Sequence, residues 1–201
     1  WRPISRRRAA SSERITSLTI DLRAHLRRVK PDKHLRQLAP RRPDYLVTAA
    51  DVITGGRAAI VIDTNVYIRS AADTLPAAAE LLVDEGLLFH CSVCVSELST
   101  GVANADPAHV GWKALRDYYA GVIANIPATR LLTPDPDVWA EAGLIAGTLA
   151  RAQNWQRHQR KEALNDALIF LTAAKAGLPV LTANRDEFDL NLGIWRRDTA
   201  S

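Results

Sequence analysis

The chain has few of the features that mark an exported or membrane-bound protein. Only two of its 201 residues are cysteines, and the pair Cys91 and Cys94 is half of a zinc site with no second pair at a suitable spacing. We therefore expect both thiols to lie in the core of a protein from a reducing compartment. No stretch approaches the roughly 20 apolar residues of a membrane span, and residues 1–45 lack the apolar segment of a secretory signal. These absences predict a cytoplasmic protein without a membrane partner.

Positive charge is concentrated at the front of the chain. Residues 1–45 contain 13 lysines and arginines against 4 acids, whereas residues 46–201 contain 13 against 18. In the basic part, a helix predicted for residues 11–26 carries an apolar stripe made of Ile15, Leu18, Leu22 and Leu26. A single helix is not stable alone, so we expect this stripe to pack on the rest of the protein, on a second copy or on another chain. We assign residues 1–57 to a basic helical extension and 58–201 to the main domain.

From residue 58 onward, apolar runs of strand length alternate with helical patterns. The predicted strands are 58–62, 87–93, 129–133 and 180–182; the predicted helices are 45–53, 65–71, 77–84, 95–103, 108–124, 138–150 and 163–176. The first two strands lack polar alternation, as is typical of parallel strands covered on both faces. The pattern predicts an α/β fold, a three-layer α/β/α sandwich with a central, mainly parallel sheet, to which the N-terminal helical extension is attached.

Three acids occupy unusual positions: two lie near the ends of predicted strands, where ligands bind, and one lies in an apolar helix, where burying its charge is unfavourable. Asp63 ends the first strand and Glu97 follows the second closely, and ligands of open α/β sheets bind at the carboxyl ends of such strands. Asp166 lies in a helix that is apolar on nearly every side, so its burial requires a partner. Each has a structural alternative. Asp63 could cap the helix that follows it, and Glu97 could interact with the dipole of its helix. Asp166 could pair with a neighbouring amide or arginine.

Taken together, these positions predict a metal site. Strand-end residues near 63, 97 and 184 and a helix acid at 166 would meet at one edge of a parallel sheet. Several carboxylates cannot all stay ionised side by side without a cation, and hard oxygen ligands favour Mg²⁺ or Mn²⁺. Such a cluster can activate water and neutralise phosphate charge in phosphodiester hydrolysis.

Five short motifs follow one another in the second part of the chain: Val61-Ile-Asp-Thr-Asn65, Ser96-Glu97-Leu98 with Gly101, Asp166-Ala-Leu-Ile169, Gly177-Leu-Pro-Val180, and Thr182-x-Asn184-x-x-Glu187-Phe188. In this order and spacing they resemble a PIN-domain ribonuclease, most similar to the VapC-type toxins of toxin–antitoxin modules. The resemblance covers about residues 58–195. It implies metal-binding acids at Asp63, Glu97 and Asp166, cleavage of RNA that depends on Mg²⁺ or Mn²⁺, frequent homodimers and inhibition by a cognate antitoxin.

Further residues around the three acids have expected roles, of which the resemblance supplies only the first. The fourth position of the family, usually Asp or Asn, falls on Asn184, which offers an amide oxygen but no charge. Asp186 could supply the missing charge if the polar turn after the last strand folds inward, and we expect Glu187 to serve the packing of that turn. Three further polar residues are expected to orient the acids rather than to bind metal: Thr64, Asn65 and Thr182.

A basic stretch precedes the helix of Asp166. It contains one aromatic residue among four cations: Arg151, Trp155, Arg157, Arg160 and Lys161. Alternating cations and aromatic rings suit phosphate pairing combined with base stacking. We therefore expect this stretch to line the approach to Asp166 and to contact RNA, with a merely solvated loop as the alternative.

The sequence thus predicts a metal-dependent endoribonuclease, the toxin of a toxin–antitoxin pair. Two other interpretations compete with it: a catalytically inactive PIN-fold module that binds RNA or a partner, and a phosphoryl-transfer α/β domain of another class. All three acids are present, which disfavours the first. A haloacid-dehalogenase nucleophile is normally followed two residues later by a second Asp, where this chain has Asn65, which disfavours the second.

Overall fold

The computed structural model describes residues 20–41, 47–53 and 57–195, and within these ranges one parallel sheet forms the centre of the molecule. Its strands are β1 (Ala59–Ile62), β2 (Leu87–Cys91), β3 (Leu131–Leu132) and β4 (Val180–Leu181), in the order β3-β2-β1-β4. β1 therefore lies inside the sheet, with Ile60 opposite Leu88 and Val61 opposite Val180. Its buried, small and β-branched residues suit such a strand.

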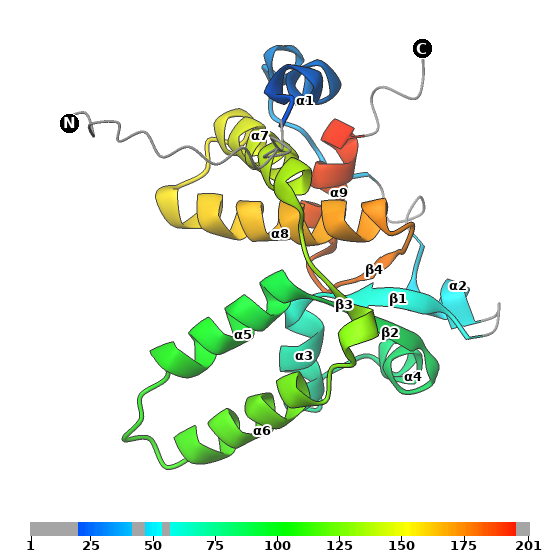
Figure 1. Ribbon diagram of the computed structural model, residues 1–201, viewed down its shortest axis with the longest axis vertical. Helices are drawn as coiled ribbons and strands as arrows, with labels where there is room; N and C mark the ends of the chain where they lie inside the picture. Colours follow the sequence, from blue (N-terminus) through cyan, green and yellow to red (C-terminus); the bar gives the residue numbers. More distant parts are fainter. Residues whose placement is uncertain (1–19, 42–46, 54–56, 196–201) are drawn as a thin grey trace, which may run out of the picture.

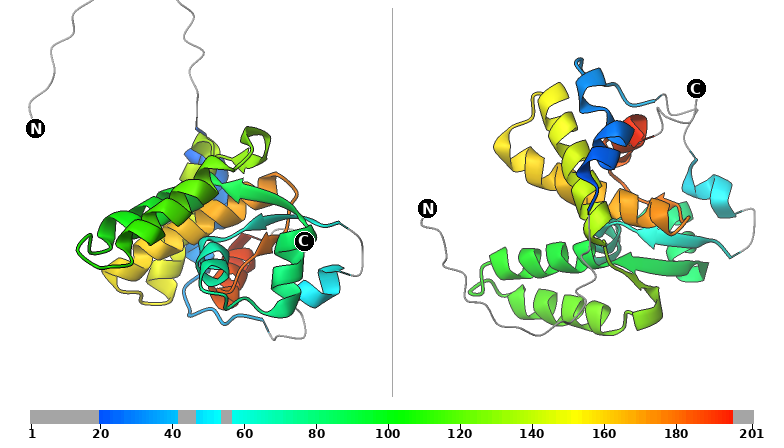
Figure 2. Two further views of the ribbon diagram at one scale, coloured as in Figure 1. Left: turned by 90° about the horizontal axis from the view of Figure 1, so that it is seen from below. Right: turned by 45° about the horizontal axis from the view of Figure 1, so that its top comes forward.

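Helices cover both faces of this sheet (Figure 1). One face carries α7 (Pro136–Ala152), α8 (Arg157–Lys175) and α9 (Arg185–Trp195); the other carries α3 (Thr64–Ala71), α4 (Ala77–Glu85), α5 (Ser92–Asn104) and α6 (Trp112–Ala124). A 3-10 turn at Ala128–Arg130 precedes β3. The expected three-layer α/β/α sandwich is confirmed. Turned views show α5 and α6 running side by side away from the sheet (Figure 2).

The two cysteines are free and buried, as expected. Cys91 is the last residue of β2, and Cys94 lies in the first turn of α5. The prediction that the strand continues to residue 93 and the helix starts at 95 was wrong. The stretch from Leu87 to Val95 is mostly apolar, with no glycine or proline inside it, so its pattern contains no clear signal for the point at which strand becomes helix.

Two other boundaries also differ from the sequence prediction. Only residues 153–156 of the basic stretch 151–161 connect two helices, because α7 continues to Ala152 and α8 already begins at Arg157. The side chains of Gln156 and Gln159 form a reciprocal cap that starts α8 at this point. The residues after β4 form the helix α9 rather than a polar turn, with two acids in its first turn.

The N-terminal extension packs on the body through α1 (Leu22–Val29), which lies against α7 (Figure 1). The predicted stripe is not its buried face: Leu22 and Leu26 are 49% and 40% exposed, and His25 and Val29 are buried instead. Residues 11–19 of the predicted helix lie outside the described part. A 3-10 turn (Pro31–Lys33) and the short helix α2 (Ala49–Ile53) follow. None of the described helices is long and apolar enough to cross a membrane.

Polar contacts explain why the face with a histidine is the buried one. The ring of His25 lies 3.2 Å from carboxylate oxygens of both Asp137 and Glu141 on α7, and the Arg28 guanidinium donates to Glu141 at 3.0 Å. Two basic side chains thus meet a buried acid of α7, which a sequence pattern based on apolar spacing cannot show. The extension is held by charge pairing as well as by the apolar contact of Val29.

Candidate metal centre at the carboxyl edge of the sheet

Asp63 lies at the junction of β1 and α3, and it is 3% exposed. Its Oδ1 accepts a hydrogen bond of 2.6 Å from the backbone N–H of Thr64, so it caps α3 as the structural alternative proposed. Its Oδ2 accepts a bond of 2.7 Å from the hydroxyl of Thr182 and another from the amide of Asn65. The backbone N–H of Asp63 donates to Leu181 at 3.0 Å, which ties the acid to the end of β4.

Glu97 reaches the same place from α5. Its carboxylate accepts hydrogen bonds from the Thr64 hydroxyl and, at 2.7 Å, from the side-chain amide of Asn165. Ligand atoms of Asp63, Glu97 and Cys94 all lie within 4.8 Å of one another. The two carboxylates expected from the sequence are therefore neighbours.

Cys94 belongs to this group by distance but not by chemistry. Its thiol donates to the carbonyl of Ile62 at 3.6 Å, and burial raises its pKa well above the usual value for a cysteine. A thiol that keeps its proton is not a ligand, and Mg²⁺ prefers oxygen. We therefore treat Cys94 as a core residue beneath the acids.

Asp166 projects from α8 toward the same edge and is 9% exposed. Its Oδ2 accepts a bond of 3.2 Å from the side-chain amide of Asn184. Burial, a hydrogen bond with Glu187 and the charges of Asp63, Glu187 and Glu97 raise its pKa to about 9. Without a cation, the protonated form of Asp166 is therefore favoured beside Glu187.

The start of α9 brings Glu187, and not Asp186, to the acids. Glu187 accepts from the amide of Asn184 and contacts Asp166. Asp186 has a side chain that is 60% exposed and pairs with Arg185 at 3.1 Å, so it lies outside the cluster. The expectation of a charge from Asp186 and a packing role for Glu187 depended on a turn. In a helix, residues three apart lie on the same face. Because α9 begins directly after Asn184, the side chain of Glu187 lies beside that of Asn184 at the metal centre.

A network of hydroxyls and amides holds these carboxylates in place. Thr64 donates to Glu97, and Thr182 donates to Asp63. The amide of Asn65 contacts the Thr182 hydroxyl at 3.2 Å, and its oxygen accepts from the backbone of Ala183 at 2.8 Å. The residues expected to orient the acids therefore all contact an acid or the strand end that carries one.

Without a cation, the negative charges of these carboxylates repel one another. Burial is the largest cause that raises the pKa of Asp63, to about 6, and the charge of Glu97 adds to it. Four carboxyl groups converge from separate elements: Asp63, Glu97, Asp166 and Glu187. A divalent cation would relieve this repulsion, and an all-oxygen donor set suits Mg²⁺ or Mn²⁺. The residues present therefore fit such an ion.

The model of the PIN domain family matches residues 60–190, a range that includes all four acids. The chain belongs to the PIN domain family. Among solved structures, a chain of the "Crystal Structure of FitAcB from Neisseria gonorrhoeae" is 24% identical, with 66% of this chain and 92% of that chain covered and a TM-score of 0.49. That likeness is too distant to assign a function. Comparison with curated protein sequences gives no match.

The raised pKa values of this PIN domain predict an unusual pH dependence of its stability. Asp63 and Asp166 bind protons more tightly in the folded state than an exposed Asp does, with pKa values of about 6 and about 9 against a usual 3.8. Through these two groups the folded protein holds more protons than the unfolded chain above pH 4, so their contribution to its stability falls as pH rises from 4 toward 9, whereas the lowered pKa of His90 acts in the opposite direction up to about pH 6.5. Urea unfolding in EDTA should show lower stability at pH 8.5 than at pH 5.5.

Asp166→Asn is the matched control for this prediction. Asparagine keeps the shape of the side chain but has no proton to lose, so the difference between the two pH values should become smaller. A pH dependence that is identical in the variant would show that Asp166 does not cause it. An excess of Mg²⁺ should also reduce the slope, because the ion favours the ionised carboxylates.

The basic residues expected to bind RNA do not form one surface in the PIN domain. The guanidinium of Arg151 donates to the backbone carbonyls of Pro31 and His34, so it holds the N-terminal extension. Trp155 packs against the core, and Arg160 contacts its backbone carbonyl at 3.4 Å. The side chain of Arg157 lies outside the described part. Lys161 lines a groove that also contains Glu97.

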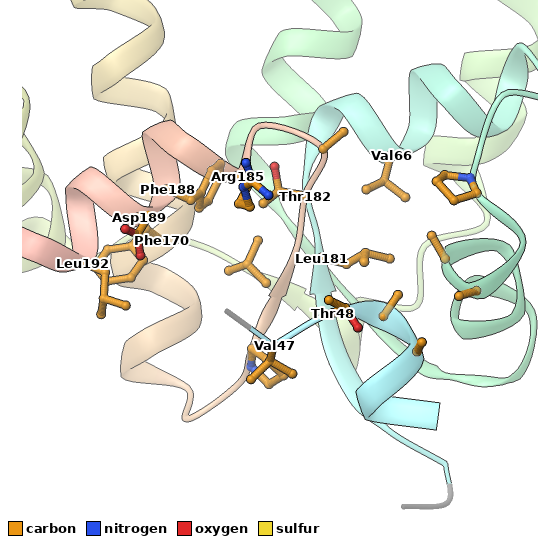
Figure 3. Close-up of a pocket in the computed structure, with 18 of the residues that line it drawn as sticks. Val47, Thr48, Val66, Phe170, Leu181, Thr182, Arg185, Phe188, Asp189 and Leu192 are labelled. Atoms are coloured by element: carbon orange, nitrogen blue, oxygen red, sulfur yellow. The ribbon is translucent and has the colours of Figure 1, made fainter. Parts of the chain in front are cut away.

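An apolar groove of about 610 Å³ lies beside the metal centre, along the outer edge of β4 (Figure 3). Leu181 forms part of its floor, and Phe188 and Leu192 of α9 line one side. Asp189 is at this wall, but its carboxylate is bound by Arg41 at 2.7 Å. Thr182 borders the groove and also donates to Asp63, so this side chain separates the apolar groove from the acids.

Proposed function

We propose that this PIN domain is an endoribonuclease that depends on Mg²⁺ or Mn²⁺. The observation that supports this most is the meeting of Asp63, Glu97, Asp166 and Glu187 at one edge of the sheet, where two of them have strongly raised pKa values. Such a group of buried acids is costly to the fold unless it serves a cation. A catalytically inactive module would have no need to keep it.

The residues of the chain would prepare the site before RNA arrives. Thr64 and Asn165 fix Glu97 from two sides, and Thr182 and Asn65 fix Asp63. When bound, a divalent cation would lower the pKa of a water molecule and offset the charge developing on the phosphate. Carboxylates held by hydrogen bonds need no rearrangement for this chemistry, which is the advantage of a preorganised site.

The finer parts of the proposal come from the motifs shared with VapC-type toxins. They are cleavage of single-stranded or structured RNA, a cognate antitoxin that inhibits it, a homodimeric assembly and a cytoplasmic location. Residues 1–57 would be an extension outside the nuclease domain 58–201, and within it α1 contributes no acid to the metal centre. Asn184 would orient Asp166 and Glu187 through its amide.

Incubation with a total cellular RNA pool tests the activity. The purified protein should fragment RNA in Mg²⁺ or Mn²⁺ and should leave it intact in EDTA, and added metal should restore cleavage. Glu97→Gln removes one ligand charge while keeping the hydrogen-bonding shape, so it should lower cleavage by about 100-fold or more. Equal cleavage in EDTA, or by a folded Glu97→Gln protein, would rule out the metal-dependent mechanism.

A further inference from the structure

A polar groove of about 870 Å³ extends from the metal centre between α5 and α8. Figure 1 shows the two helices diverging as they leave the sheet, and α5 supplies one wall and α8 the other. The residues that matter for the argument are Ser96, Glu97, Gly101 and Asn104 on α5 and Lys161 and Asn165 on α8. One of the four acids is thus also part of the groove wall.

Helical spacing gives the groove an inner and an outer end. At the inner end, the amide of Asn165 donates to Glu97 at 2.7 Å. Asn104 lies seven residues further along α5, about 10 Å away at 1.5 Å per residue. Lys161 stands one turn before Asn165 on α8, so it also lies toward the outer end. A strand that leaves the acids along this groove would pass Gly101 before it reaches Asn104 and Lys161.

The described residues that line the groove offer neutral polar groups, one cation at Lys161 and two carboxylates, at Glu97 next to the metal centre and at Glu162. Asn104 is exposed, and its side chain makes no hydrogen bond to the other described residues. Lys161 is exposed and forms no ion pair within the described ranges. Among the described residues that line this groove there is no aromatic ring. Amides read the edges of unpaired bases, and a lysine binds a phosphate as a point charge.

We propose that the groove between α5 and α8 binds the nucleotides of single-stranded RNA adjacent to the cleaved bond, and that Asn104 selects the base at its outer end. The proposal rests on the proposed nuclease function and adds to it the location and the chemistry of sequence selection. Base-paired RNA would not satisfy the amide of Asn104, because its Watson–Crick edges are already occupied. The PIN domain therefore cuts single strands at preferred sequences.

Gly101→Leu tests the groove directly. A Cβ atom at Gly101 would meet nothing within 4 Å, so a leucine side chain has room to enter the groove without disturbing the fold. Gly121→Leu on α6 is the matched control, because Gly121 is also an exposed helical glycine with an open Cβ position and does not line the groove. Both changes replace glycine by a better helix former.

We expect Gly101→Leu to lower kcat/KM for a single-stranded RNA oligonucleotide by about 30-fold or more, corresponding to roughly 2 kcal/mol. Its Mn²⁺ affinity, measured by calorimetry, should equal that of the wild type, and Gly121→Leu should match the wild type in both measurements. If Gly101→Leu cleaved the oligonucleotide as efficiently as the wild type, the groove assignment would be overturned, but the nuclease function would stand. Absence of metal-dependent cleavage by the wild type would instead remove the nuclease function itself.

Two substitutions separate base selection from phosphate binding. Asn104→Ala should broaden the bases found at the cut sites, as determined by sequencing the cleaved ends, and should preserve Mn²⁺ affinity. Lys161→Ala should reduce the slope of log affinity against log salt by about 0.7, the value for one phosphate contact on a single strand. Unchanged cut-site preference in Asn104→Ala would contradict the role of this residue, and an unchanged salt slope would remove Lys161 from the RNA path.

Discussion

Asp63→Asn should reduce RNA cleavage by about 1,000-fold or more while the protein stays folded, since one lost charge-stabilising contact in a preorganised site has an effect of about this size. Asp63 is the most buried of the four acids, and it receives hydrogen bonds from Thr182, Asn65 and the backbone of Thr64. Asparagine occupies the same volume, but it removes a full negative charge from the centre of the site.

Stability measured in EDTA provides the control for this variant. Burial raises the pKa of Asp63 to about 6, so the ionised group is unfavourable in the metal-free fold at neutral pH. The neutral asparagine removes this penalty, but its NH2 group cannot accept a hydrogen bond, so at least one of the three donors loses its acceptor and the midpoint of urea unfolding at pH 7.5 should shift only slightly. A folded Asp63→Asn protein that cleaves RNA at the wild-type rate would show that this acid does not take part in the chemistry.

Glu187→Gln should weaken Mn²⁺ binding by about 10- to 100-fold and lower cleavage by a similar factor, whereas Asp186→Asn should change both by less than about twofold. The two acids are neighbours in sequence, but only Glu187 contacts Asn184 and Asp166. Asp186 is paired with Arg185 at the surface. The pair of variants is well matched, since each exchanges a carboxylate for its own amide in the first turn of α9.

The opposite order of effects would contradict the assignment of the fourth acid. Calorimetric titration of Mn²⁺ and cleavage assays on the same preparations provide the comparison. If Asp186→Asn abolished binding and Glu187→Gln did not, α9 would have to begin differently in solution. Equal losses in both variants would point to a general effect of charge near the site rather than to one ligand.

Much of the site can be predicted from the sequence because local patterns mark it. Asp63 follows an apolar strand directly, and Asp166 interrupts an apolar helix, so both stand out from their neighbours. The fold follows from the alternation of strands and helices. Glu187 could have been recognised as well, because a helix starting at Arg185 places it one turn after Asn184, but the polar residues there suggested a turn.

Other features depend on contacts between distant residues, which a local pattern does not contain. Arg151 belongs to a basic stretch, yet it binds carbonyls of Pro31 and His34, more than 100 residues earlier in the chain. His25 is buried on α1 because Glu141 and Asp137 of α7 meet it. Apolar spacing alone favoured Leu22 and Leu26 as the packed face. Such pairings became visible only with the tertiary structure.

Crystals soaked in Mn²⁺ give the most direct test of the central claim that these acids form one metal centre. Anomalous scattering locates the ion independently of any activity measurement. We expect a peak within ligand distance, about 2.0–2.5 Å, of carboxylate oxygens from Asp63 and Asp166, with Glu97 or Glu187 adjacent to it. A peak bound by Cys94 without Asp166, or no peak at this edge of the sheet under saturating Mn²⁺, would contradict the account.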